Sequence, residues 1–237
     1  MPRFKRKIVT VSGLLLPAIL AFQTQAYELE IHGSNTVGAT LAPMLVRGYL
    51  EEHSGNRVTS TGTGVENEQV LQARMNNNTT EVLVAAHGSS TGFRALAAGQ
   101  ADIWASSRPV KSEEAQQLQA RADLTALESE HVIAIDGLAI LVHPSNPVSK
   151  MSIETLGRVF SGQIRNWSEL GGPDRPIHLY ARDDRSGTWD TFKSLVLGKQ
   201  FELDSNARRY ESNDQLSDDV SRDPGGIGFS GLASGGN

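Results

Sequence analysis

Three short segments of the chain share a composition that suits the binding of a small anion. Each carries glycine, serine or threonine where an expected strand gives way to an expected helix: Gly33–Thr36, Gly88–Thr91 and Arg185–Thr188. The first N–H groups of a helix have no partner inside it, and the helix dipole adds a partial positive charge there. Such a terminus binds phosphate, sulfate or carboxylate groups. Three of them meeting at one point would surround a tetrahedral oxyanion with donors.

Arg182 stands just ahead of the third segment. Its guanidinium could bind two oxygens of one anion at once. Two plainer interpretations stay open. Serine and threonine cap helices in proteins of every kind, and Arg182 could form a surface ion pair with Asp184 instead.

The same residues also allow an enzymatic interpretation. Gly88–Gly92 matches the pattern G-x-S-x-G between a strand and a helix, with Ser90 as the nucleophile. The candidate partners of Ser90 are Asp136 or Asp184 and His143 or His178. Too little chain precedes Ser90 for the usual strands of that fold, and there is no HGGG-type loop. We therefore expect no catalysis, no cofactor and, without an i, i+4 histidine pair, no metal site.

The first 26 residues have the pattern of a cleaved secretion signal. Four bases lie within Met1–Lys7, the run Ile8–Phe22 is mostly apolar, and the segment ends on Ala26. A membrane anchor would need roughly 20 apolar residues. Cleavage before Tyr27 leaves 18 basic and 27 acidic side chains, a net charge of −9. This predicts a periplasmic protein that does not bind nucleic acid. The absence of cysteine excludes a disulfide framework, a thiolate zinc site and a cysteine nucleophile.

Strands and helices alternate along the rest of the chain, which predicts an α/β layered fold. A helix to about Glu52 is expected to bury a face that includes Met44, Leu45 and Tyr49. The segments Glu68–Met75 and Thr79–Ala86 predict a hairpin. The stretch Val132–His143 is almost wholly apolar and predicts one buried strand. Further helices are expected over Ser112–Ala122, Thr188–Leu197 and Asn213–Ser221, and a final strand over Gly226–Phe229.

Five motifs, in this order, make the chain resemble the phosphate-binding proteins of ABC importers. They are GSNTV (33–37), GSSTGF (88–93), ADIWASSR (101–108), RDDRSGT (182–188) and PGGIGF (224–229). The similarity runs from Leu29 to Ala233. It implies a two-lobed periplasmic-binding-protein fold (type II, Venus flytrap) that closes on an anion at a hinge and carries out no reaction.

The resemblance also assigns site residues and lobes. The phosphate-binding residues would be Thr36, Val37, Ser89, Ser107, Arg182, Ser186, Gly187 and Thr188. Lobe one would be residues 27–135 completed by 226–237, and lobe two 136–225. The hinge would comprise the strand Val132–His143 and the strand near Gly226. We expect a monomer that binds inorganic phosphate and delivers it to an ABC permease.

The chain departs from the family pattern in three places. Some members carry aspartate where Ser107 stands, and that carboxylate accepts the proton of hydrogen phosphate. Phosphate and sulfate therefore both remain open, unless Asp183 reaches the site. The hairpin resembles a subgroup in which this domain precedes an OmpA-like cell-wall-binding domain, so an envelope scaffold or adhesion module is an alternative. Asn237 comes soon after the point where the family's chain returns to lobe one, which predicts a C-terminally truncated fold.

Overall fold

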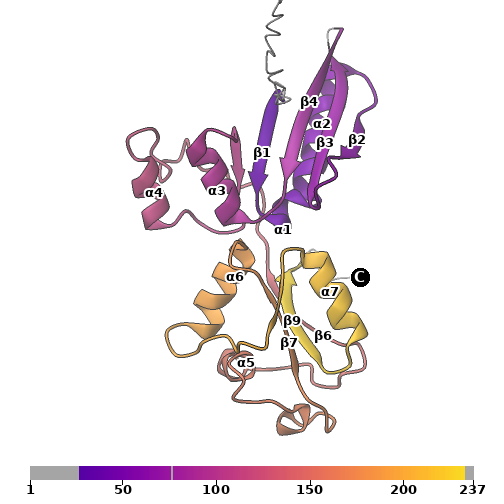
Figure 1. Cartoon of the computed structure of the whole chain (residues 1–237), viewed down its shortest axis with the longest axis vertical. Helices are drawn as coiled ribbons and strands as arrows, with labels where there is room; N and C mark the ends of the chain where they lie inside the picture. Colours follow the sequence, from indigo (N-terminus) through magenta and orange to yellow (C-terminus); the bar gives the residue numbers. More distant parts are fainter. Residues whose placement is uncertain (1–26, 76, 233–237) are drawn as a thin grey trace, which may run out of the picture.

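The computed structural model describes residues 27–75 and 77–232. The predicted signal segment lies outside the described residues. The chain folds into two sheets, each with its own helices, which meet at a narrow waist (Figure 1). None of the helices in the described ranges has the length and apolar character needed to cross a bilayer. The α/β class and the division into two sheets agree with the sequence pattern.

The first sheet has the strand order β2-β3-β4-β1-β5. Its strands are β1 (Leu29–Gly33), β2 (Thr59–Gly62), β3 (Glu68–Met75), β4 (Asn78–Ala85) and β5 (Ile103–Ala105). Its helices are α1 (Asn35–Gly38), α2 (Leu41–Ser54), α3 (Ser89–Ala98) and α4 (Ser112–Leu118). β1 runs parallel to β4 and β5, whereas β2, β3 and β4 are antiparallel. The predicted hairpin is confirmed as β3 and β4, and Asn77 in its turn is left-handed with φ 70°.

The predicted buried face of α2 is wrong. Met44 is 64% exposed, and Leu45 and Tyr49 are also exposed. The helix instead buries Ala42, Val46 and Leu50 in the core of the first sheet. These three recur every four residues and so share one face.

The second sheet has the strand order β6-β9-β7-β8. Its strands are β6 (Leu138–Val142), β7 (His178–Arg182), β8 (Arg208–Tyr210) and β9 (Gly226–Gly231). Its helices are α5 (Ile153–Phe160), a 3₁₀ turn (Trp167–Leu170), α6 (Gly187–Phe192), which continues as a π-helical turn (Lys193–Leu197), and α7 (Asn213–Arg222). β7 runs parallel to β8 and β9. Its core is aromatic: the rings of Phe192 and Phe229 stack with centroids 3.9 Å apart.

Two expectations about the connection between the sheets are wrong. β9 pairs with β6 and β7, so residues 226–231 belong to the second sheet rather than completing lobe one. Residues 233–237 lie outside the described part. The predicted strand Val132–His143 begins only at Leu138, and Ile135 is 97% exposed. The Asp136 carboxylate accepts the N–H of Gly137 at 2.8 Å, a local bond of the kind that competes with strand pairing. It also accepts the N–H of Leu232, just after β9, at 3.2 Å.

Candidate oxyanion site between the two sheets

The hydroxyl groups of three serines meet where β1, α3 and β5 end or begin on one side of the waist. The Ser34 Oγ donates to the Ser107 Oγ at 2.8 Å. The Ser89 Oγ lies 3.4 Å from the same oxygen and accepts the Ser107 N–H at 3.2 Å. Because β1 and β5 are parallel neighbours, their carboxyl ends bring these loops together. The first sheet thus presents a small group of hydroxyls at its edge.

The start of α6 brings a second set of groups to these hydroxyls from the other sheet. The Thr188 Oγ1 lies 2.9 Å from the Thr36 Oγ1 across the interface. A Cβ added to Gly187 would lie 2.6 Å from the Ser107 Oγ and closer still to the Ser89 Oγ. Only glycine allows the α6 backbone to approach so closely. Five predicted residues are therefore brought together: Thr36, Ser89, Ser107, Gly187 and Thr188.

Two further predicted residues lie at the edge of this cluster. The Ser186 Oγ caps α6 by accepting the Trp189 N–H at 3.2 Å. Capping, the plainer interpretation of these hydroxyl-rich turns, therefore applies to this side chain. The Val37 side chain packs against the core of the first sheet. The Ser186 N–H donates to the Asp183 carbonyl at 3.1 Å, so of these two residues only the Val37 main-chain N–H remains as a candidate donor to an anion.

Arg182 lies behind the cluster rather than in it. It is 1% exposed and donates to the Tyr210 carbonyl at 3.2 Å, to the Glu211 carbonyl and to the Asn213 Oδ1. Burial lowers the pKa of Arg182 to about 10, although nearby carboxylates partly offset this effect. The guanidinium is still protonated at neutral pH, so it places a buried positive charge close to the hydroxyls.

Asn213, at the start of α7, links Arg182 to the first sheet and was not predicted. Its Nδ2 donates to the Thr36 Oγ1 at 3.0 Å, and its main-chain N–H donates to the Asn35 Oδ1 at 3.0 Å. It is 1% exposed. The only sequence signal was an asparagine at the beginning of an expected helix, a common place for that residue.

The carboxylates considered from the sequence have other partners. Asp183 binds the Arg185 Nε at 2.8 Å, and Asp184 binds the Arg209 Nη2 at 2.6 Å. The surface ion pair suggested for Arg182 and Asp184 is therefore not formed.

Ser90 and its candidate catalytic partners are likewise engaged separately. The Ser90 Oγ accepts from the Arg108 Nη2 at 3.4 Å. His143 bonds to Ser145 (2.8 Å) and His178 to Asp223 (2.7 Å). The arrangement does not assemble a Ser-His-Asp triad. Within residues 27–75 and 77–232, no group of three or more histidine and carboxylate side chains is placed to hold a metal ion.

A buried ion-pair group ties the two sheets together beside the serine cluster. The Arg108 Nε donates to the Asp190 Oδ2 of α6 at 2.7 Å, and its Nη2 donates to the Glu114 Oε1 at 2.6 Å. Burial alone would raise the pKa of Glu114, but the bonds from Arg108 and Lys111 hold it below its ordinary value. The carboxylate therefore stays ionised, and Arg108 joins the first sheet to the helix that carries Gly187.

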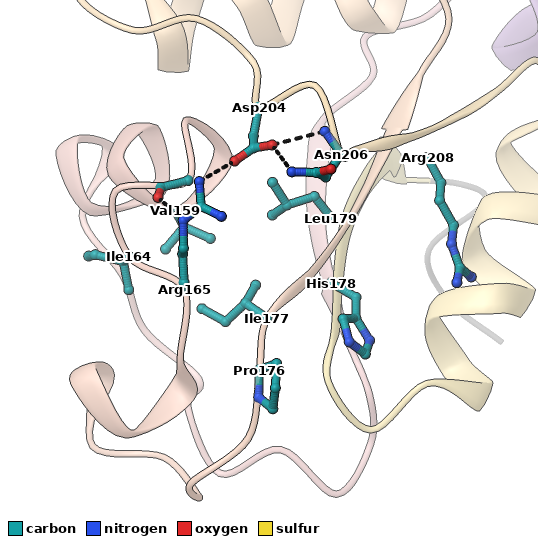
Figure 2. Close-up of a pocket in the computed structure, with 11 residues that line it drawn as sticks. Val159, Ile164, Arg165, Pro176, Ile177, His178, Leu179, Asp204, Asn206 and Arg208 are labelled. Carbon is teal, nitrogen blue, oxygen red and sulfur yellow. Dashed lines mark hydrogen bonds and ion pairs between the residues drawn. The ribbon is translucent and has the colours of Figure 1, made fainter.

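A hollow of about 360 Å³ lies elsewhere, in the second sheet beside the start of β7 and of β8 (Figure 2). Apolar side chains such as Ile164, Ile177 and Leu179 line it, and Asp204 at its edge is already bonded to Arg165 and Asn206. None of the predicted site residues reaches this hollow. The hydroxyl cluster is a set of direct contacts.

The two α/β sheets that meet at a waist are the fold of a two-lobed binding protein. A family profile described as a PBP superfamily domain matches residues 23–237, and the chain belongs to this superfamily. The two-lobed periplasmic-binding-protein fold expected from the sequence is thereby confirmed.

Among proteins of known sequence, the chain is similar to phosphate-binding proteins named PstS. It is 31% identical to the one from Borreliella burgdorferi over 180 residues, which are 73% of this chain and 61% of that protein. It is 31% identical to the one from Bacillus subtilis (strain 168) over 183 residues, 76% of this chain and 58% of that protein. The chain thus spans about three fifths of the length of these relatives.

Two crystal structures illustrate the similarity of the fold. A putative phosphate ABC transporter substrate-binding protein from Clostridium perfringens, with bound phosphate, has a TM-score of 0.66 at 25% identity. The match covers 86% of this chain and 70% of that one. An ABC-type phosphate transport receptor from Vibrio cholerae has a TM-score of 0.58 at 28% identity, covering 87% and 72%. The family resemblance drawn from the five motifs is confirmed.

Proposed function

We propose that the chain binds a tetrahedral inorganic oxyanion between its two sheets and performs no reaction on it. The proposed anion is phosphate. The observation that carries this proposal is the meeting of Thr36, Ser89 and Ser107 from one sheet with Gly187 and Thr188 from the other. The names of the relatives, phosphate-binding proteins and receptors, support phosphate as the anion.

Binding would exchange hydroxyl-to-hydroxyl contacts for hydroxyl-to-anion bonds. The Thr36–Thr188 contact would open, and each hydroxyl would donate to an anion oxygen. The main-chain N–H group of Val37 would add a donor from the first sheet. A hydrogen bond to a charged group contributes roughly 1.5–3 kcal/mol, so several together reach micromolar affinity, which corresponds to about 8 kcal/mol.

Arg182 would contribute its charge. Its guanidinium is held by two carbonyl groups and Asn213, and Asn213 in turn reaches Thr36. A positive charge in a low-dielectric surrounding attracts an anion without touching it. In this proposal Asn213 orients the Thr36 hydroxyl, and the charge of Arg182 makes the electrostatic potential at that hydroxyl more positive.

The protein would act outside the cytoplasmic membrane as a monomer. This part of the proposal is supported by the signal-like pattern of residues 1–26 and by relatives described as components of phosphate ABC transport. The partner would be an ABC permease, or an OmpA-like cell-wall-binding domain if the chain belongs to that subgroup.

Thermal shift and calorimetry with phosphate, sulfate, molybdate and buffer alone test the proposal. We expect phosphate to bind one to one and to raise Tm, since saturation at 100 Kd stabilises a protein by about 2.7 kcal/mol. Comparable shifts with sulfate would show that Ser107, in place of a carboxylate, does not discriminate. No shift with any of the three anions would overturn the proposal. Labelling of Ser90 by a fluorophosphonate would instead indicate a hydrolase.

A further inference from the structure

His87 lies between two carboxylates that belong to opposite sides of the waist. Its Nε2 is 2.9 Å from the Glu68 Oε1, on β3 of the first sheet. Its Nδ1 is 2.9 Å from the Glu211 Oε1, in the loop between β8 of the second sheet and α7. We call the second sheet with its helices the second part. All three side chains are partly buried. The imidazole therefore bridges the interface near the proposed anion site.

Glu211 connects this bridge to the site. Its Oε1 also accepts from the Asn67 Nδ2 at 2.7 Å, and its Oε2 binds the Arg185 Nη2 at 2.6 Å. Its main-chain carbonyl accepts from Arg182, and two residues further on Asn213 reaches Thr36. Fixing the Glu211 carboxylate to the first sheet thus fixes the segment that holds Arg182 and Asn213 in place.

Both bonds of His87 require its protonated form. An ionised carboxylate only accepts hydrogen bonds, so both ring nitrogens must donate, and only the imidazolium carries two N–H groups. The charged groups around the ring are Glu68 from β3, Glu211 from the loop before α7, and Arg185 with its partner Asp183 from the loop before α6. Loss of the proton removes one donor and leaves Arg185 as the only cation among three carboxylates in this group.

We propose that protonated His87 and Glu211 act as positioning residues that clamp the two sheets together over the anion site, and that the clamp is released when His87 loses its proton. The consequence for anion retention rests on the proposed function, whereas the closure itself does not. The bridge spans 124 positions of the chain, so it reports on the closed arrangement and not on local folding.

The direction of the pH dependence follows from the two partners. Burial lowers the pKa of His87, but its bonds to Glu68 and Glu211 outweigh that effect and raise the pKa above the ordinary value of 6.5. A raised pKa in the closed form means that the stabilisation is complete below the ordinary pKa and is lost as pH rises through the raised value. Burial raises the pKa of Glu211, but bonds from His87 and Asn67 hold it below its ordinary value. Glu211 therefore stays ionised over the whole pH range in which His87 titrates, and protonation of Glu211 releases the clamp only at a much lower pH.

The distance between the two sheets measures the clamp without any anion. The sequence has no cysteine, so Glu52→Cys in the first sheet's α2 and Lys199→Cys in the second part give two unique labels at exposed positions. We expect the closed-to-open ratio to fall about fivefold or more between about pH 5.5 and pH 8.5, the low end of a typical coupling between sites. His87→Gln should be more open at the lower pH and independent of pH.

A matched control separates the clamp from general titration. His178→Gln removes a histidine that bonds to Asp223 within the second part (2.7 Å), and it should keep the pH slope of the parent protein. Glu211→Gln, which keeps an acceptor but removes the charge, should flatten the slope as His87→Gln does. A parent protein whose closed fraction does not change with pH, or a His87→Gln variant that keeps the slope, would overturn the proposal.

Calorimetry with phosphate tests the link to the site. The ratio of Kd values for His87→Gln and the parent protein cancels the titration of phosphate itself. We expect this ratio to be about five at about pH 5.5 and to approach one at about pH 8.5. A ratio that does not change with pH would contradict the link to the site. If neither protein binds phosphate at any pH, the proposed function fails, and the distance measurement still decides on the clamp.

Discussion

At the scale of single residues, the absence of a side chain at position 187 matters as much as the hydroxyls around it. Gly187 brings the α6 backbone against Ser89 and Ser107, and Thr188 then meets Thr36. A binding site between two sheets needs a backbone segment that can approach the opposite sheet without a side chain in the way, and glycine provides this. The proposed affinity therefore depends on this position directly.

Gly187→Ala should weaken phosphate binding while the fold persists. The added methyl group would displace the hydroxyls of Ser89 and Ser107, and overpacking of this kind costs about 1–3 kcal/mol, a loss of affinity of roughly five- to 140-fold. Calorimetry measures the loss. Gly48→Ala is the control, because a Cβ at Gly48 meets nothing within 4 Å. Unchanged affinity in Gly187→Ala would remove this residue from the site.

The sequence identified hydroxyl residues by type but could not identify the contacts that pass between the two sheets. Thr36, Ser89 and Thr188 stand in motifs whose composition alone suggests anion binding. Asn213 and the pair His87–Glu211 have no such motif. Their roles come from packing that joins residues far apart in the chain, which no local pattern encodes.

At the scale of elements, the last strand carries the second sheet's core. β9 lies between β6 and β7, and its Phe229 stacks on Phe192 at an interplanar angle of 6°. The strand itself was predicted from Gly226–Phe229, but its sheet was not. Strand pairing between distant segments depends on the whole topology, and the pattern of a short apolar run is the same in either sheet.

Phe229→Ala should destabilise the second sheet and spare the first. Phe229 is fully buried, and such truncations cost about 3–5 kcal/mol. Hydrogen exchange should show faster exchange in β7 and α6, with β3 and α2 unchanged at low denaturant. Leu71→Ala, in the core of the first sheet, should give the reverse pattern. Equal loss of protection in both sheets would contradict the assignment of β9 to the second sheet's core.

The face of α2 illustrates a limit of hydrophobic periodicity. Two apolar sets run along this helix, and the sequence favoured the larger side chains. The structure buries Ala42, Val46 and Leu50 instead, and leaves Tyr49 stacked on His53 at a centroid distance of 4.1 Å. Apolar side chains on a helix surface are common, so size alone does not decide which face is covered.

At the scale of the whole molecule, the acidic charge opposes the proposed ligand at long range. The chain carries a net charge of −5, and −9 without residues 1–26. The donors that would bind an anion act only at contact distance. We therefore expect the association rate of phosphate to increase when salt screens the repulsion, over a Debye length of about 30 Å at 0.01 M and 8 Å at 0.15 M.

Stopped-flow fluorescence checks this expectation, with sodium chloride raised over that range and tryptophan emission as the signal. Trp189 follows Thr188 directly and is a natural reporter. A dissociation rate that stays nearly constant would show that salt acts on the association step. An association rate that falls with salt would show instead that the buried Arg182 and its neighbours dominate the long-range field.

Among residues 27–75 and 77–232, no hydrophobic cluster crosses the waist. One draws on β1, α2, β3 and β4, and the other two draw on elements from Leu138 onward. The waist is joined by polar groups such as Thr36–Thr188, Arg108–Asp190 and His87–Glu211. Substitutions at the waist can therefore change the free energy of separating the two sheets without disturbing the hydrophobic core of either one. Selection could adjust ligand retention and thermal robustness as two independent traits.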